Sequence, residues 1–168
     1  QVADWQVILQ KYYPDKKINS GYVTDLMQGY FRVKDYPNAE LLAKAIINMK
    51  DASVKQKEYA TLIWSTSIGL IAQIEEGRKN FSAAAEQWYR IYLETPGYKD
   101  VDQAIYFAAE NYDKEKEFNR SNELYNQLIE RFPNSTKLVE NAHRNIYSNF
   151  IEMKAFSLSS KQAERNYY

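Results

Sequence analysis

A lysine followed by one variable residue and an aromatic residue recurs four times along this chain, and no other feature constrains its fold as strongly. The four copies are Lys34–Tyr36, Lys79–Phe81, Lys116–Phe118 and Lys154–Phe156. Their aromatic residues stand 45, 37 and 38 positions apart. A repeat period a little above about 34 residues is typical of helical hairpins that stack in an array. The motif therefore predicts a chain built from successive helical hairpins.

The composition agrees with a helical chain that is large enough to have a core. The chain has 168 residues, of which 45% are hydrophobic, and it contains only five glycines and four prolines. Its 22 basic and 22 acidic residues balance, so neither nucleic acid nor an anionic membrane surface is an expected partner. No run approaches the length of about 20 apolar residues that a membrane span requires. We therefore expect an all-α protein that does not cross a membrane.

The residues around each copy of the motif follow a common pattern. A first helix carries a large residue, an apolar–small pair and an aromatic, and a second helix carries small and aromatic residues before a proline. The stretch 102–133 matches best, through Ile105, Ala108, Ala109, Tyr112, Phe118, Ser121, Tyr125, Leu128 and Pro133. This pattern resembles the tetratricopeptide repeat family. The resemblance implies a right-handed superhelical solenoid of stacked antiparallel hairpins, and an unrelated helical bundle is the alternative.

On this pattern the chain is a single solenoid, residues 1–168, with an incomplete first repeat. The ranges are 1–15 for the second helix of a truncated repeat, then 21–51, 58–96, 102–133 and 137–168 for the repeats that follow. Leu9 stands five positions before Pro14, as Leu128 does before Pro133, which is why 1–15 is interpreted as a second helix. We expect that both ends are cut from a longer array, and that residues 1–15 pack onto residues 21–50.

The sequence offers no clear catalytic or metal centre. It has no cysteine and one histidine, His143, at the large-residue position of the last repeat. Asp100 and Asp102 lack the glycine and the distal glutamate of a calcium loop, and helix capping explains them better. The acidic pairs Glu75–Glu76 and Glu115–Glu117 are interpreted as solvated surface. We therefore predict a non-enzymatic protein without a metal or another cofactor.

Solenoids of this family typically hold a peptide or a helix of a partner protein in a concave groove lined by their first helices. The candidates are the positions that flank the core stripe of those helices. They are Thr24, Gln28, Arg32, Thr66, Gln73, Tyr106, Glu110, Lys114, Arg144 and Ser148. Chaperone-binding members of the family carry Lys and Asn where the first complete repeat has Thr24 and Gln28. We therefore do not expect co-chaperone activity.

Tyrosine is unusually frequent, with 15 residues, and suggests an alternative function. The tyrosines that the repeat pattern leaves over include Tyr12, Tyr13, Tyr22, Tyr89, Tyr92, Tyr98 and Tyr106. Exposed tyrosines are common on binding surfaces. A solvent-facing platform of Tyr89, Tyr92, Tyr98 and Trp88 would favour a module that binds glycan or peptidoglycan, or a helper module of a larger protein.

The repeat period and the helix endings resemble one branch of the family. The run "ELYNQLIERFPNS" (Glu123–Ser135) is similar to runs in bacterial cell-envelope members such as the outer-membrane assembly lipoprotein BamD and the Tol–Pal-associated protein CpoB. The resemblance implies a scaffold in a bacterial envelope complex, in the periplasm or at the outer membrane. A lipid anchor on a cysteine upstream of Gln1 is compatible with it, and a cytoplasmic location is the alternative.

Overall fold

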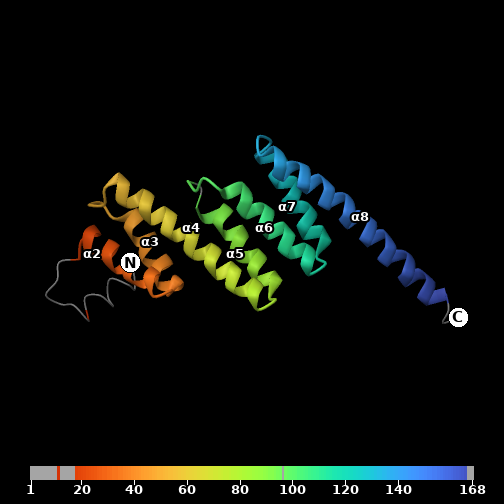
Figure 1. The fold of residues 1–168 in the computed structure, drawn as a ribbon, viewed down its shortest axis with the longest axis horizontal. Coiled ribbons are helices and arrows are strands. Elements are labelled where there is room, and N and C mark those ends of the chain that lie inside the picture. Colours follow the sequence, from red (N-terminus) through yellow and green to blue (C-terminus); the bar gives the residue numbers. More distant parts are fainter. Residues whose placement is uncertain (1–10, 12–17, 96, 166–168) are drawn as a thin grey trace. The chain divides into compact units, whose positions relative to one another are not determined.

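A computed structural model describes residue 11 and residues 18–95 and 97–165, and this part of the chain contains α-helices and no strand. Seven helices follow one another there, as Figure 1 shows. They are α2 (Ser20–Arg32), α3 (Tyr36–Asn48), α4 (Val54–Gly77), α5 (Phe81–Glu94), α6 (Val101–Lys114), α7 (Phe118–Arg131) and α8 (Thr136–Arg165). The expectation of an all-α chain is confirmed for these residues. The predicted helix in residues 1–15 lies outside the described part, except for Lys11.

Three of the four lysine motifs form the turns between paired helices. Lys34, Lys79 and Lys116 have φ angles of 64°, 61° and 61°, in the left-handed region that non-glycine residues rarely adopt. At the α6–α7 turn the Lys116 amide donates to Asp113 O, and the next amide donates to Tyr112 O, both at 2.9 Å. The same two bonds recur around Lys34 and Lys79. Each motif is therefore a Schellman C-cap that ends one helix and reverses the chain.

The fourth copy of the motif does not form a turn. Helix α8 runs without interruption from Thr136 to Arg165 and passes through Lys154–Phe156. Ala155 stands where the three turns have Asp35, Asn80 and Glu117. Alanine has the highest helix propensity and offers no side-chain acceptor for a new helix N-terminus. The hairpin expected for 137–168 is therefore absent from the described residues, and one long helix takes its place.

Polar side chains define where helices begin. Asn19 accepts a hydrogen bond from the Tyr22 amide at 3.0 Å and caps α2. Ser53 and Gln56 form a reciprocal capping box at the start of α4, with bonds of 2.9 and 3.3 Å. Asp100 occupies the N-cap position of α6, as expected, but its side chain makes no capping bond. Helix α7 ends at Arg131, two residues before Pro133, because proline cannot continue a helix.

The described chain divides into two compact units, and α4 contributes to both. The N-terminal unit contains the described residues up to 71 together with 94, 95 and 97–99, and its core comes from α2, α3 and the first half of α4. Core side chains are Val23, Met27, Ala39, Leu42, Ala43, Ile46, Ala60 and Ile63. Asp51 stabilises the beginning of α2, because its carboxylate accepts a hydrogen bond from the Ser20 amide at 2.8 Å.

The C-terminal unit contains residues 72–93 and the described residues from 100 onward. Its core side chains are Ala85, Ile105, Tyr106, Ala108, Ala109, Tyr112, Leu124, Tyr125, Leu128 and Ala142. Small residues let the helix axes approach, and the tyrosine rings fill the remaining space. Each fully buried aliphatic side chain, such as Ile105 or Leu128, contributes about 1.5–3 kcal/mol to stability. The repeat pattern therefore predicted most of this core.

No helix in the described part of the chain combines the length and the apolar character needed to cross a membrane. The same residues bring no three His, Cys, Asp or Glu side chains into a group that could hold a metal ion.

Substituting the turn lysines tests whether the motif acts through its left-handed backbone. Lys79→Gly should raise the free energy of unfolding by up to about 1 kcal/mol, because glycine adopts positive φ without a Cβ clash. Lys154→Gly should instead weaken the helical circular dichroism signal, because glycine inside a helix costs about 1 kcal/mol. Urea titrations followed by circular dichroism measure both effects. A loss of stability in Lys79→Gly as large as in Lys79→Val would contradict the assignment of the turn.

Candidate functional site

Three adjoining depressions open on the C-terminal unit around Phe118, where the α6–α7 turn meets α8. The largest measures about 670 Å³ and is lined by Lys116, Phe118, Glu152, Met153, Ala155 and Phe156. The second, about 350 Å³, is lined by Lys116, Glu117, Phe118, Asn119, Arg120 and Met153. The third, about 280 Å³, is lined by Glu110, Asp113, Lys114, Phe118, Asn145, Ser148, Asn149 and Glu152. Together they form one surface feature, which we call the Phe118 groove.

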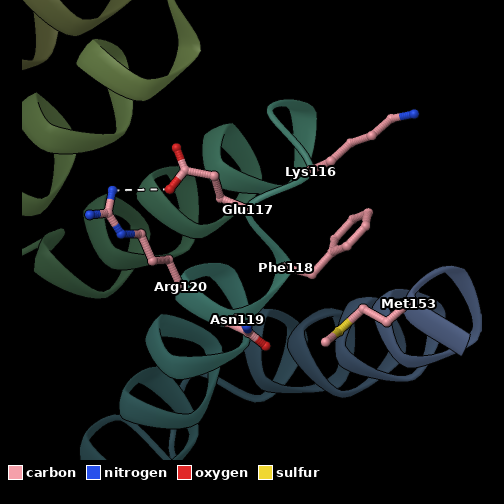
Figure 2. A pocket seen from close by; sticks show the side chains of 6 residues that line it. All are labelled: Lys116, Glu117, Phe118, Asn119, Arg120 and Met153. Carbon is pink, nitrogen blue, oxygen red and sulfur yellow. Dashed lines mark ion pairs between the residues drawn. The ribbon is translucent and has the colours of Figure 1, made fainter. Parts of the chain in front are cut away.

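The lysine turn places Phe118 at the centre of this groove. Because Lys116 reverses the chain, Phe118 becomes the first residue of α7 and is half-buried rather than part of the core. Figure 2 shows the Phe118 ring between the side chains of Lys116 and of Met153 from α8, and all three residues line the two larger depressions. An ion pair of 3.0 Å between Arg120 and Glu117 borders the second depression. The local backbone therefore presents an aromatic ring at the surface.

The groove combines an apolar end with an acidic end. Phe118, Met153 and Phe156 line the largest depression. The third depression lies between α6 and α8, and three of its lining residues are acidic, against a single basic residue, Lys114. The Lys114 amine also lies 5.2 Å from the centre of the Phe81 ring, in a cation–π contact. A molecule with adjacent apolar and basic groups matches this surface.

A polar network holds α8 in the position that forms the groove. The Asp113 carboxylate of α6 accepts from the Tyr125 hydroxyl at 2.8 Å and from the Asn149 amide at 2.6 Å. The Asn149 amide also donates to Asn122 Oδ1 at 2.9 Å, and the Asn145 amide donates to the Tyr125 hydroxyl at 2.7 Å. These bonds join α6, α7 and α8. Buried polar groups that satisfy one another in this way favour one arrangement of the helices.

Burial raises the pKa values of three tyrosines in this part of the C-terminal unit. Burial raises the pKa of the Tyr125 hydroxyl well above its usual range, and the charge of Asp113 adds to the shift. Burial and the charge of Glu110 raise the pKa of Tyr106 to about 12. Burial also raises the pKa of Tyr112, although the positive charge of Arg120 opposes that shift. All three hydroxyls are therefore neutral at physiological pH.

Three of the groove candidates chosen from the sequence line the third depression. They are Glu110 and Lys114 on α6 and Ser148 on α8. Arg144 is exposed on α8 and Gln73 on α4, and neither belongs to the Phe118 groove. Tyr106 is only 8% exposed and belongs to the core, with its hydroxyl 3.4 Å from the Asn145 amide. Tyr106 therefore offers almost no surface to a partner.

The other four candidates lie in the N-terminal unit, on α2 and α4. Thr24 is half-buried and uses its hydroxyl to donate to Ser20 O at 2.6 Å. Gln28 and Thr66 are half-buried, and Arg32 is exposed in the last turn of α2. Thr24 therefore has a structural role at the start of its helix.

The N-terminal unit contains a charged cluster that the sequence did not suggest. Glu40 is only 8% exposed and pairs with Lys44 at 2.7 Å, while the Lys44 amine also contacts Glu94 at 2.9 Å. The amine lies 4.9 Å from the centre of the Trp64 ring. Burial alone would lower the pKa of Lys44, but its bonds to the two carboxylates outweigh this effect and raise the pKa. Lys44 therefore bonds to two carboxylates at once, as in a structural ion-pair cluster.

Three of the four aromatic residues proposed as a glycan platform are partly covered by a core. Trp88, Tyr89 and Tyr92 are half-buried and pack against the core of the C-terminal unit. Tyr89 and Tyr92 stack on each other with ring centres 5.7 Å apart. The Trp88 indole donates to Glu76 Oε1 at 2.9 Å, so Glu76 is a hydrogen-bonding partner rather than plain solvated surface. The observation on which a glycan-binding role depended is therefore missing for these three residues.

Sequence reasoning missed the central residues of the groove. Phe118 was interpreted as a repeat-core aromatic, and Met153 carried no signal because α8 was expected to end in a turn nearby. The available signal was the turn itself, since an aromatic residue directly after a helix reversal begins the next helix at the protein surface.

No protein-family model matches this chain, and a comparison with curated proteins finds no significant match.

Removing Asn149 tests whether the polar network holds α8. Asn149→Ala should lower the free energy of unfolding by about 1–3 kcal/mol, because Asn122 Oδ1 loses its bond from Asn149 and Asp113 keeps only its bond from Tyr125. Ser148→Ala, at the neighbouring exposed position, should change it by less than about 0.5 kcal/mol. Urea titration measures both values. Equal effects of the two substitutions would rule out a special role for the network.

Alkaline unfolding tests the raised pKa values. Between the unfolded pKa of about 10 and the higher folded value, the folded protein keeps a proton that the unfolded chain has lost. The free energy of unfolding should therefore be constant below pH about 10 and fall above it, by up to about 1.4 kcal/mol per pH unit for each buried tyrosine. Urea titrations at a series of pH values measure the slope. Tyr125→Phe should make it shallower, and an unchanged slope would exclude Tyr125 as its source.

Proposed function

We propose that this protein is a non-enzymatic interaction scaffold that binds a peptide or a helix of a partner protein in the Phe118 groove. The proposal rests on one observation. Glu110, Lys114 and Ser148 were chosen as groove positions from the sequence alone, and they line the same depression between α6 and α8. That depression continues into an apolar one of about 670 Å³, which is large enough for one or two side chains.

The chemistry of the groove favours a particular peptide. An apolar side chain fits the depression lined by Phe118, Met153 and Phe156. A neighbouring Lys or Arg side chain then faces the carboxylates of Glu110 and Glu152, where charge complementarity sets orientation and association rate. The polar network beneath the groove fixes α6, α7 and α8, so little ordering is required when the peptide binds.

We also propose a wider architecture and setting for this scaffold. The hairpins build a right-handed solenoid of the tetratricopeptide type, and the protein acts in a bacterial envelope complex, in the periplasm or at the outer membrane. Support for the architecture comes from the three identical lysine turns and from the repeat pattern of residues 102–133. Support for the setting comes from the similarity of the run Glu123–Ser135 to envelope members of that family.

Selection of peptides from a displayed random library on the immobilised full chain tests the binding function. We expect enriched sequences in which an apolar residue adjoins a Lys or Arg. Glu152→Lys should then weaken binding of the enriched peptides at least about tenfold, because it reverses a groove charge, and Ser148→Trp should do so by filling the third depression. Fluorescence anisotropy with labelled peptides measures the affinity of each variant.

Two variants on the exposed surface of α7 serve as matched controls. Glu130→Lys repeats the charge reversal, and Asn126→Trp repeats the gain in volume, at residues that do not line the groove. Both should bind the enriched peptides with wild-type affinity. Failure to enrich any peptide, or equal affinities in groove and control variants, would refute the groove as a binding site.

A further inference from the structure

A second surface of the C-terminal unit is apolar and uncovered. Tyr147, Phe150 and Ile151 of α8 are 69%, 59% and 53% exposed, and they are neighbours on one helix. Ala142 and Asn149 on the opposite side are buried against the rest of the unit. The uncovered residues do not line the Phe118 groove. Three large apolar side chains side by side on an exposed helix are typical of an interaction surface.

Comparison with α6 explains why the apolar face of α8 is exposed. Ile105, Ala109 and Tyr112 are buried in the core that α6 shares with α7, and they stand 38 residues before His143, Tyr147 and Phe150. Helix α8 has no such hairpin partner, because Lys154–Phe156 does not form a turn. The side of α8 that corresponds to the α7-facing side of α6 therefore lacks a covering helix within the described residues.

Charges at the two ends of this face show which helix fits it. Glu140, Tyr147 and Lys154 lie seven residues apart, so they form one row along α8. Glu140 and Lys154 are both exposed, and their separation along the helix is about 21 Å, too far for a bond within one chain. A second α8 laid antiparallel, with a two-fold axis at Tyr147, brings Glu140 of each copy opposite Lys154 of the other.

We propose that the occupant of this face is the α8 helix of a second copy of the protein, so that the chain forms an antiparallel two-fold dimer. The same patch serves both subunits, as two-fold symmetry requires. Tyr147, Phe150 and Ile151 of both copies form the apolar centre, and two Glu140–Lys154 pairs close its ends. The groove residues Glu152 and Met153 lie on another side of the helix, so dimerisation and peptide binding use different surfaces.

Charge reversal tests this pairing on the full chain. Glu140→Lys places Lys opposite Lys twice, and Lys154→Glu places Glu opposite Glu twice. Each variant should therefore raise the dimer dissociation constant by roughly 10- to 100-fold relative to wild type. An equimolar mixture of the two variants should recover the dimer, because the lysine introduced in one variant then faces the glutamate introduced in the other. Sedimentation velocity over a range of concentrations measures the dissociation constants.

A matched control and four possible outcomes make the test decisive. Glu130→Lys on α7 should leave the dissociation constant unchanged, and circular dichroism should show the same helicity in all variants. Recovery of the dimer by the mixture supports antiparallel pairing. A monomeric wild type, or a dimer that neither single variant weakens, would overturn it and leave the face to a different protein. A mixture that stays monomeric would also overturn the pairing.

Discussion

The arrangement of this protein depends on a backbone conformation that its side chains do not favour. At three points a lysine adopts positive φ, and two amide bonds close the end of the preceding helix around it. The local cost is about 1–2 kcal/mol at each lysine, and the packing of the paired helices offsets it. Because each turn reverses the chain within three residues, the amphipathic helices on either side meet along their apolar faces. The cores of both units follow from that contact.

The α6–α7 turn also creates the candidate site. It ends α6 at Lys114 and begins α7 at Phe118, so the ring stays at the surface beside α8. Helix α8 is fixed there by bonds from Asn145 and Asn149 to Tyr125 and Asp113. An apolar side chain would pack at least as well as an asparagine at these positions. The polar choice instead specifies a single rotation of α8, and with it which α8 residues line the groove.

That rotation has a second consequence. With Asn149 facing inward, Tyr147 and Ile151 face outward, since residues two positions away lie on the opposite side of a helix. The same bonds that shape the Phe118 groove therefore set the apolar face for which we propose a second copy of the chain. One hydrogen-bond network therefore orients two separate surfaces, and a different rotation of α8 would move both of them together.

Particular residues show what was predictable. The stripe of Ile105, Ala108 and Ala109 indicated a helix buried on one side, and burial follows because small residues at helical spacing allow close approach. Glu110, Lys114 and Ser148, which the same register placed beside the stripe, lined the third depression. Tyr106 did not, since a position flanking the stripe can face a neighbouring helix as readily as solvent. Its burial depends on Tyr125 and Asn145, which are distant in the sequence.

The sequence alone therefore determined the helices, the repeat period and the positions that pack within a hairpin, because propensity and periodicity act over a few residues. It did not separate the three motifs that turn from the fourth, although Ala155 marks the difference. Tertiary structure alone decided that Phe118 lies beside Met153, that Glu76 bonds to Trp88, and that one face of α8 stays uncovered. These outcomes depend on contacts between residues far apart in the chain, which no local pattern encodes.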